Sequence, residues 1–260
     1  MITFSIITAA RNAENHIADC LDSIRCQADG TQSAFRIEHL VVDGASTDGT
    51  LDIVRDYERR VRPPLSVHVV SEPDRGIYDA MNKGIAAATG DVVGTLNADD
   101  AYAGPDVLSR VYSTFGDEAT SASYGDLHFF RDDPDGTREI VRRWRAGPYS
   151  VRSFRWGWMP PHPTFFARRS LFESHGAYRL DLGSAADYEL MLRFLVRCGI
   201  AANYIPEVLV HMRIGGVSTR SLANRLRANR MDRRAWRENE LRPYPWTLLL
   251  KPLRKLHQFL

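Results

Sequence analysis

Residues 91–100 read DVVGTLNADD, an apolar run rich in β-branched side chains that ends in two aspartates. Residues 91–97 have the composition of a buried strand, so we expect Asp99 and Asp100 just past its carboxyl end. Three earlier segments are also apolar and β-branched and predict strands: residues 2–8, 36–43 and 66–71. Runs of this kind are typical of a parallel sheet that is covered on both faces.

Between these strands, apolar side chains recur at helical spacing. The periodic residues are Ile17, Leu21 and Ile24 in the first segment, Leu51, Ile53, Val54 and Tyr57 in the second, and Met81, Ile85 and Ala88 in the third. The alternation of strands and helices predicts an α/β fold, with a mostly parallel central sheet and helices on both of its faces.

After Asp100 the pattern becomes less regular. The remaining segments predict a helix over 105–115, a strand over 121–130, a buried helix over 184–198 and a strand over 204–214. The prolines that flank His162 exclude regular structure around it. We therefore expect one domain over residues 1–217, followed by a helical tail over residues 218–260.

The composition is that of a folded, globular protein. The chain has 260 residues and a mass of 29.4 kDa, with 44% hydrophobic and 25% charged residues. Its three cysteines include no CxxC pair, which disfavours a disulfide scaffold and a zinc ribbon. No apolar run reaches the roughly 18 residues of a membrane span, and the N-terminus lacks the pattern of a signal peptide. We expect a reduced, cytoplasmic protein.

The net charge of +2 conceals two regions of opposite sign. Residues 213–260 contain twelve Lys and Arg against three Asp and Glu, a charge of +9. Residues 1–212 contain 22 basic and 29 acidic residues, a charge of −7. A basic tail on an acidic body indicates that the tail meets a negatively charged surface.

Carboxylates follow three successive predicted strands: Asp43, Asp74, and the pair Asp99 and Asp100. Each alone is explained by a turn or a helix cap. Because ligands collect at the carboxyl ends of strands in open α/β sheets, their joint placement favours a binding site. Oxygen ligands suit Mg²⁺ or Mn²⁺ together with substrate phosphates. The chain has neither a G-x-G dinucleotide fingerprint nor a P-loop lysine motif.

Several sequence blocks occur in a distinctive order. They are TAARNAE (8–14), VDGASTDGT (42–50), SEPDRGIYDAMNKG (71–84), LNADD (96–100), PHPTFFARRSLF (161–172), AADYEL (185–190) and GGVS (215–218). The blocks resemble those of family 2 glycosyltransferases with the GT-A fold. The likeness is greatest to bacterial enzymes that build O-antigen, exopolysaccharide or other cell-surface glycans, and it covers residues 2–218. It implies a GT-A catalytic domain over residues 1–217.

The resemblance implies roles for the strand-end residues. Asp43 would accept a hydrogen bond from the nucleotide base, and a carboxylate that accepts from an imide N–H favours uridine or thymidine. Asp99 would face the ribose, and Asp100, with Asp99, would bind the metal that bridges the diphosphate. The other nucleotide-sugar contacts that the blocks imply are Thr8, Asn12, Glu14, Asp74, Arg75 and Lys83. For Lys83, an ion pair with Asp79 at i, i+4 is an equally good explanation.

Asp187 is the catalytic base that the resemblance implies. Inverting members of the family use one carboxylate to deprotonate the acceptor hydroxyl, because the metal already stabilises the leaving group. The alternative is a capping box formed by Ser184 and Asp187. His211 lies a few positions earlier than the late histidine that ligates the metal in many GT-A enzymes.

The predicted reaction is therefore inverting, metal-dependent transfer of a sugar from a nucleotide diphosphate sugar, most simply a UDP-sugar. The acceptor would be a hydroxyl of a glycan or a lipid-linked molecule. Two alternatives stay open: a sugar nucleotidyltransferase, and a non-catalytic sugar-nucleotide-binding or scaffold protein. Nucleic acid is disfavoured as a partner because the body is acidic and the basic residues are not interleaved with aromatic ones.

The tail has the pattern of an amphipathic helix. One face has Trp246, Leu249, Leu250, Leu253, Leu256 and Leu260, and the other has Lys251, Arg254, Lys255 and Gln258. This pattern is typical of a helix on an anionic membrane surface, and equally of a helix that packs on protein. The first interpretation would place the protein peripherally on the inner face of the cell membrane. Trp156 and Trp158 fit either a sugar-stacking surface or the core.

Overall fold

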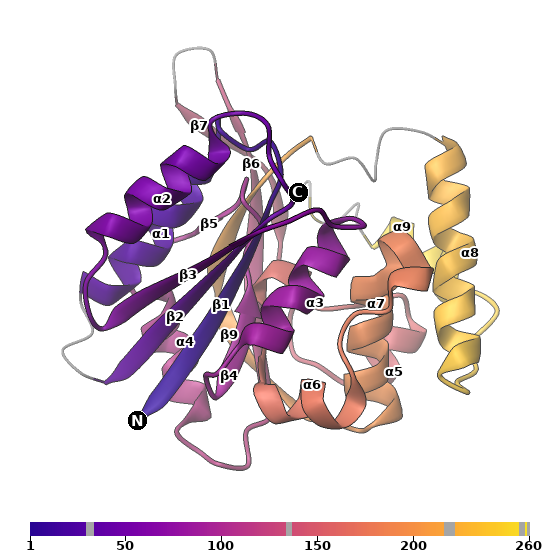
Figure 1. Ribbon diagram of the computed structural model, residues 1–260. Helices are drawn as coiled ribbons and strands as arrows, with labels where there is room; N and C mark the ends of the chain where they lie inside the picture. The colour runs from indigo at the N-terminus through magenta and orange to yellow at the C-terminus, as the bar shows by residue number, and fades with distance from the viewer. Residues whose placement is uncertain (30–33, 134–136, 216–221, 255–257, 259–260) are drawn as a thin grey trace.

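The computed structural model describes residues 1–29, 34–133, 137–215, 222–254 and 258. One large β-sheet runs through the middle of the molecule and has helices on both of its faces (Figure 1). Its strand order is β3-β2-β1-β4-β8-β6-β9-β5, with β7 paired to β6. The strands are β1 (Ile2–Ala10), β2 (Phe35–Asp43), β3 (Leu65–Ser71), β4 (Val92–Thr95), β5 (Ala101–Tyr102), β6 (Ala122–Asp132), β7 (Arg138–Trp144), β8 (Phe166–Arg168) and β9 (Ala202–Arg213).

The amino-terminal half of the sheet is parallel. Strand β1 lies between β2 and β4, and β3 pairs with β2 on the outer side. Strand β8 runs antiparallel to both β4 and β6, while β6 and β9 are parallel to each other. The α/β architecture and the mostly parallel sheet that the sequence predicts are confirmed.

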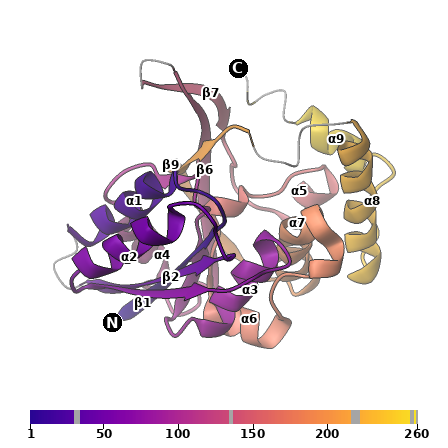
Figure 2. The same ribbon diagram turned by 45° about the horizontal axis from the view of Figure 1, so that its top comes forward.

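The helices divide between the two faces of the sheet (Figures 1 and 2). One face is covered by α1 (Ile17–Asp29), α2 (Thr50–Arg60) and α4 (Val107–Phe115). The other is covered by α3 (Ile77–Ala87), α5 (Val151–Arg155), α6 (Arg169–His175) and α7 (Ala186–Met191). Shorter helical segments are η1 (His162–Thr164), η2 (Leu180–Ala185) and the π-helix η3 (Leu192–Arg197).

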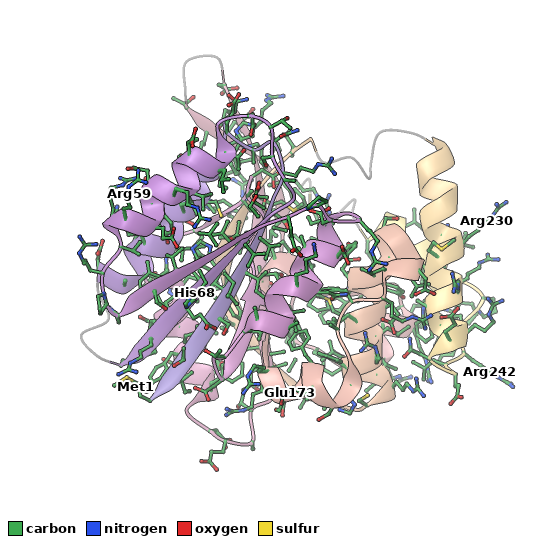
Figure 3. The ribbon with its side chains drawn as sticks, in the orientation of Figure 1. Met1, Arg59, His68, Glu173, Arg230 and Arg242 are labelled. Carbon is green, nitrogen blue, oxygen red and sulfur yellow. The ribbon has the colours of Figure 1, made fainter. Side chains whose placement is uncertain are left out.

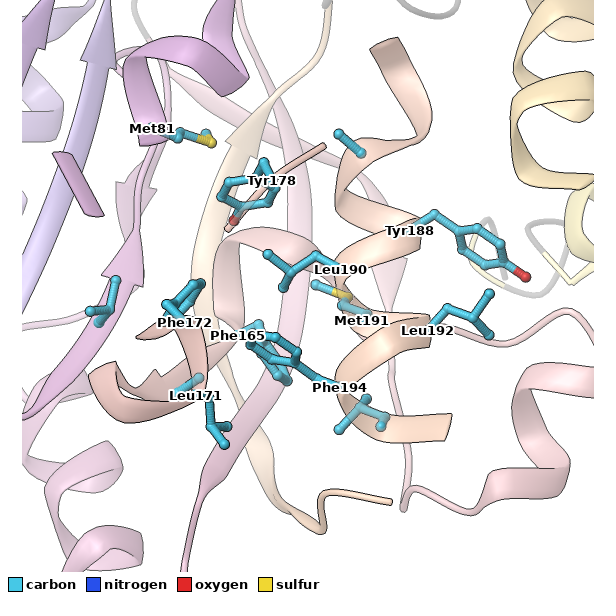
Figure 4. Close-up of a cluster of buried hydrophobic side chains, with 14 of the residues drawn as sticks. Met81, Phe165, Leu171, Phe172, Tyr178, Tyr188, Leu190, Met191, Leu192 and Phe194 are labelled. Carbon is cyan, nitrogen blue, oxygen red and sulfur yellow. The ribbon is translucent and has the colours of Figure 1, made fainter. Parts of the chain in front are cut away.

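Each face of the sheet has its own hydrophobic core. Strand β1 contributes side chains to both cores, because successive side chains of a strand point to opposite faces of the sheet. Phe4 and Ile6 pack with α1, α2 and α4, and Ile7 packs with α3 and α6. Figure 4 shows the second core, in which Phe172 and Phe194 meet edge to face with ring centroids 5.3 Å apart. Trp158 also belongs to this core.

The sequence patterns locate the long elements better than the short ones. The predicted strand over 204–214 is β9, and the predicted helix over 184–198 is α7 continued by η3. Strand β8 has three residues and α5 has five, too few to show a periodicity. Strand β7 was not predicted, and η1 begins at His162, where the prolines were expected to exclude regular structure.

The tail contains α8 (Leu222–Glu238) and α9 (Thr247–Leu253), and parts of both pack on the domain. Trp236 of α8 is fully buried, and its Nε1 donates to the hydroxyl of Tyr188 at 2.8 Å. Leu248 of α9 is buried, and the Thr247 hydroxyl donates to the Arg155 carbonyl oxygen at 2.6 Å. The predicted boundary between residues 217 and 218 lies outside the described residues, as do two leucines of the predicted apolar face, Leu256 and Leu260.

No helix among the described residues combines the length and the apolar character that crossing a bilayer requires.

The packing of α3 on β1 depends on Gly84. A Cβ at this position would lie 2.4 Å from Cγ2 of Ile7. We expect Gly84→Ala to lower the free energy of unfolding by about 1–3 kcal/mol, because helix and strand must separate. Gly116→Ala is the matched control: its Cβ would meet nothing closer than 3.8 Å and its φ is −61°. It should raise stability by about 0.4–1 kcal/mol. Urea denaturation measures both, and equal effects would contradict a tight contact at Gly84.

A buried polar network lies beneath the parallel strands. His39 of β2 is fully buried, with its Nε2 3.0 Å from the Thr8 hydroxyl and its Nδ1 3.1 Å from the Tyr57 hydroxyl. Burial lowers the pKa of His39 from 6.5 to about 3, because the imidazolium would lose its hydration. His39 is therefore neutral in the folded protein near neutral pH.

This network predicts a pH dependence of stability. Below pH 6.5 the unfolded chain takes up a proton at His39 that the folded chain does not bind. The free energy of unfolding should then decrease as pH falls towards the folded pKa, by up to about 1.4 kcal/mol per pH unit from this residue. His39→Asn should flatten this slope in denaturation series, whereas His68→Asn, at an exposed position of β3, should leave it unchanged. A slope that persists in His39→Asn would refute this assignment.

Candidate active site

The carboxyl ends of the parallel strands meet at one edge of the sheet. Asp43, the last residue of β2, is in register with Ala10 of β1 and Ser71 of β3. Strand β4 ends at the same edge, since the backbone N–H of Leu96 donates to the Ile7 carbonyl oxygen at 3.0 Å. The loops that carry the predicted site residues, 44–49, 72–76 and 96–100, all leave the sheet there.

Asp43 organises the loop that follows β2. It is fully buried, and its carboxylate accepts hydrogen bonds from the backbone N–H and the hydroxyl of Ser46. The Ser71 hydroxyl donates to Oδ2 of Asp43 at 2.6 Å. These donors stabilise the buried carboxylate and fix the start of the loop.

Asn12 and Glu14 hold the same loop from the end of β1. Oδ1 of Asn12 accepts from the Thr47 N–H at 2.9 Å, and Oε2 of Glu14 accepts from the Gly49 N–H at 2.7 Å. Asn12 has a φ of 49°, in the left-handed region that asparagine tolerates better than most residues. Gly49 caps α2, so the Glu14 carboxylate also lies at the positive end of that helix dipole.

Asp74 lies beside this loop. Its Oδ1 accepts from the Gly76 N–H at 2.8 Å. A Cβ on Gly44 would be only 2.1 Å from Oδ2 of Asp74. The absence of a side chain at position 44 therefore lets the loops after β2 and β3 approach each other.

The two predicted basic residues lie on or near α3. Arg75 pairs with Asp79 through Nη2, at 2.9 Å, and its side chain is 78% exposed. Lys83 pairs with Glu72 at 2.8 Å and donates to the Pro73 carbonyl oxygen at 2.7 Å. In this arrangement Asp79 pairs with Arg75, and Lys83 is tied to the loop that contains Asp74.

Asp100 is buried beside a second carboxylate. It is 1% exposed, and it accepts from Nδ2 of Asn97 at 2.9 Å and from the Arg213 N–H at 3.2 Å. Asp99 is half-buried next to it. Burial, and then the charge of Asp99, raise the pKa of Asp100 well above its usual value.

This pair fits a divalent cation. A cation would offset both the burial of Asp100 and its repulsion by Asp99. Mg²⁺ and Mn²⁺ are commonly held by one or two carboxylates, with phosphates and waters completing the shell. Across the described ranges, no group of three or more His, Cys, Asp or Glu side chains is placed to hold a metal ion. His211 stacks on His128, with ring centroids 6.0 Å apart.

Asp187 is in the first turn of α7. Its Oδ1 accepts from the Tyr188 N–H at 2.7 Å. The N-cap residue of this helix is Ala185, and no side chain caps it, so the capping box considered for Ser184 and Asp187 does not form.

Three aromatic residues, Tyr78, His162 and Tyr178, lie near Asp187. Burial, and then the charge of Asp187, raise the pKa of Tyr78, in the first turn of α3, well above its usual value. His162 is half-buried with Nε2 2.8 Å from the Tyr178 hydroxyl, and desolvation lowers the pKa of His162. The rings of Tyr78 and Tyr178 are 5.3 Å apart. Because α3 starts directly after the loop of Asp74, Asp187 lies at the same edge as the strand-end carboxylates.

The structure thus brings most of the predicted site residues to one edge: Asn12, Glu14 and Asp43, then Asp74, Arg75 and Lys83, then Asp99 and Asp100, and finally Asp187. Thr8 differs from them. Its side chain is fully buried beneath the sheet edge, where its hydroxyl bonds to His39.

Sequence reasoning missed three residues at this edge. Tyr78 lies inside the 71–84 block, and its position beside Arg75 and Asp79 could have identified it. Tyr178 and Arg213 lie outside the decisive blocks and are placed only by tertiary packing. Arg213 was counted with the basic tail, yet its backbone N–H bonds to Asp100 and its guanidinium lies 4.7 Å from the Phe130 ring centroid.

Comparison with known proteins places this geometry in context. The sequence profile described as Glycosyl transferase family 2 matches residues 5–176. An uncharacterized glycosyltransferase of Mycobacterium tuberculosis is 36% identical over 198 residues, which cover 75% of this chain and 70% of that protein. A PGL/p-HBAD biosynthesis glycosyltransferase of Mycobacterium bovis is 32% identical over 217 residues, covering 83% and 78% respectively.

Two solved structures have a similar fold. Residues 1–349 of S. aureus TarS align with a TM-score of 0.65 and 18% identity, covering 98% of this chain and 72% of that one. Of a longer TarS structure the chain spans only 37%. TarS 1–349 has also been solved in complex with UDP-GlcNAc. The mannosyltransferase PcManGT of Pyrobaculum calidifontis, in complex with GDP-Man and Mn²⁺, aligns with a TM-score of 0.63 and 22% identity over 98% and 69% of the two chains. These likenesses agree with the GT-A fold.

Proposed function

The chain belongs to glycosyl transferase family 2, and we propose that it transfers a sugar, with inversion, from a nucleotide diphosphate donor to an acceptor hydroxyl during the synthesis of a cell-surface glycan. One observation carries the proposal. Asp43, Asp74 and the pair Asp99 and Asp100 leave neighbouring strands at the edge where Asp187 meets α3.

The donor would bind across the loops after β1, β2 and β3. Asp43 and Asp74, with Glu14, would form the nucleoside pocket, and Asp99 would face the ribose. A carboxylate that accepts from an imide N–H favours uracil, and the UDP-GlcNAc complex of TarS supports a UDP-sugar. Arg75 lies on the adjacent loop and Lys83 of α3 bonds to it, so a diphosphate there would be within reach of cationic side chains.

Asp100 and Asp99 would hold a divalent cation, Mg²⁺ or Mn²⁺, as the Mn²⁺ complex of PcManGT supports. Such an ion supplies Lewis-acid stabilisation of the leaving diphosphate. The chain's contribution is to keep Asp100 in place with hydrogen bonds from Asn97 and Arg213.

Asp187 would act as the base that removes the proton of the acceptor hydroxyl. That oxygen would attack the anomeric carbon on the side opposite the diphosphate, so one carboxylate suffices. The Tyr188 N–H donates to Asp187 and orients it, and Tyr78 lies beside the carboxylate. Desolvation lowers the pKa of half-buried His162 nearby, which favours its neutral form beside the carboxylate. The acceptor would be a glycan or a lipid-linked molecule, reached from the cytoplasmic side of the membrane.

The cation site is tested by thermal unfolding. We expect UDP and Mn²⁺ together to raise the Tm of the wild type, since saturation at 100 times Kd adds about 2.7 kcal/mol. Asp100→Asn should lose this increase while its ligand-free Tm stays equal or rises, because a buried charge is removed. Asp106→Asn, at an exposed position, should keep the full increase. An increase of wild-type size in Asp100→Asn would contradict the site.

The base is tested by transfer kinetics with the sugar nucleotide that gives the largest increase in Tm. Asp187→Asn should lower kcat by roughly 10²–10⁴-fold, the usual contribution of a general base, while the donor still raises the Tm. Asp181→Asn, six residues earlier and exposed, is the control and should retain activity. Normal transfer by Asp187→Asn would exclude this residue as the base.

The nucleotide product separates the two enzymatic alternatives. A glycosyltransferase releases the nucleoside diphosphate, whereas a sugar nucleotidyltransferase releases pyrophosphate. Detection of pyrophosphate alone would contradict the proposed reaction.

A further inference from the structure

Exposed apolar side chains gather where α5 meets α9. Four large apolar residues there are each 43–62% exposed: Trp156, Trp246, Leu249 and Leu253. We call these four residues the α5–α9 patch. Trp156 and Trp246 are 90 residues apart in the sequence, so the fold assembles the patch from the domain and the tail together.

The patch is held in place from below. The Thr247 hydroxyl donates to the Arg155 carbonyl oxygen at 2.6 Å, and a Cβ on Gly157 would lie 2.6 Å from the Lys251 backbone nitrogen. The rings of Trp156 and Trp246 are 5.8 Å apart. Buried Leu248 anchors α9 beneath them. The exposed apolar side chains therefore stand on a packed base.

The two chain segments that supply the patch carry charge of one sign, and within them Lys251 is paired with the buried Asp232 of α8. Neither residues 140–172 nor residues 241–260 contain an aspartate or a glutamate. Arg152, Arg242 and Arg254 are exposed in these two segments. Figure 3 shows Arg242 just beyond the end of α8, projecting outward and away from the sheet.

We propose that the α5–α9 patch docks the protein on an anionic lipid bilayer. Tryptophan prefers the boundary between headgroups and acyl chains, and leucines beside it would enter the apolar layer. Lys and Arg near the surface are attracted to anionic headgroups, each adding about five-fold to the binding constant. A second copy of this chain suits the patch poorly, because two basic surfaces would face each other.

The patch is linked to the candidate active site. The Lys251 Nζ lies 3.7 Å from the centroid of the Tyr188 ring, and Tyr188 follows Asp187. If the proposed function holds, docking through this patch brings the acceptor site close to the bilayer, where a lipid-linked acceptor resides. The docking itself does not depend on that function, so binding assays without any sugar donor test it separately.

Vesicle flotation of the full chain tests the proposal. Wild-type protein should float with vesicles of equal parts phosphatidylcholine and phosphatidylglycerol, and bind pure phosphatidylcholine at least about ten-fold more weakly. The double variant Leu249→Glu, Leu253→Glu should lose about ten-fold or more of the binding to the anionic vesicles. Val70→Glu, at an exposed aliphatic residue of β3, should bind as the wild type does. Point substitutions are preferable to removing the tail, because α9 contains buried Leu248.

A second double variant isolates the charge. Arg152→Gln with Arg254→Gln should bind the anionic vesicles about 25-fold more weakly and leave binding to phosphatidylcholine unchanged. Circular dichroism melts verify that each variant is folded. Equal wild-type binding to both vesicle types, or the same loss in Val70→Glu, would overturn the proposal. So would a dimer in analytical ultracentrifugation that Leu249→Glu dissociates, since a second copy would then cover the patch.

Discussion

A carboxylate buried at the end of a strand loses its hydration, and hydrogen-bond donors or a cation must offset that loss. The edge of this sheet where the parallel strands end contains two such carboxylates, Asp43 and Asp100. Asp43 accepts hydrogen bonds from the hydroxyls of Ser46 and Ser71, and these bonds fix the loop after β2. Asp100 has two hydrogen-bond donors and a like-charged neighbour, so its compensation is incomplete. The donors that the fold supplies therefore offset the burial of Asp43 and still leave it able to accept from a nucleotide base, whereas Asp100 leaves room for a cation.

The start of α3 connects the two halves of the proposed reaction. On one side, Asp74 precedes it and lies against Gly44. On the other, Tyr78 in its first turn lies near enough to Asp187 of α7 for the Asp187 charge to raise the pKa of Tyr78. A nucleotide held by the strand-end loops and an acceptor activated by Asp187 would thus meet across one helix. The close packing of α3 on β1, made possible by Gly84, keeps this junction fixed relative to the sheet.

The parallel half of the fold was predictable because long buried strands carry their own signal. The β-branched runs that end at Asp43 and at Asp99 place both residues at one edge once the strands are parallel. The partners of Asp187 were not predictable, since Tyr78 and Tyr178 come from separate elements and meet only through tertiary packing. The role expected for Thr8 shows a different limit of the sequence. A side chain near the end of a strand can face either the ligand edge or the core, and periodicity alone does not decide between the two. The pattern of the tail left open whether it meets a membrane surface or packs on protein, and α8 and α9 each bury part of their surface on the domain.

We propose that acidic side chains from distant parts of the chain form one nucleotide and cation site. A crystal soaked with UDP and MnCl₂ tests this site most directly, because manganese is located by its anomalous scattering. We expect an anomalous peak bound by the Asp100 carboxylate, with the uracil ring beside Asp43 and Asp74. A manganese peak away from Asp100, or UDP bound at another face of the molecule, would contradict it.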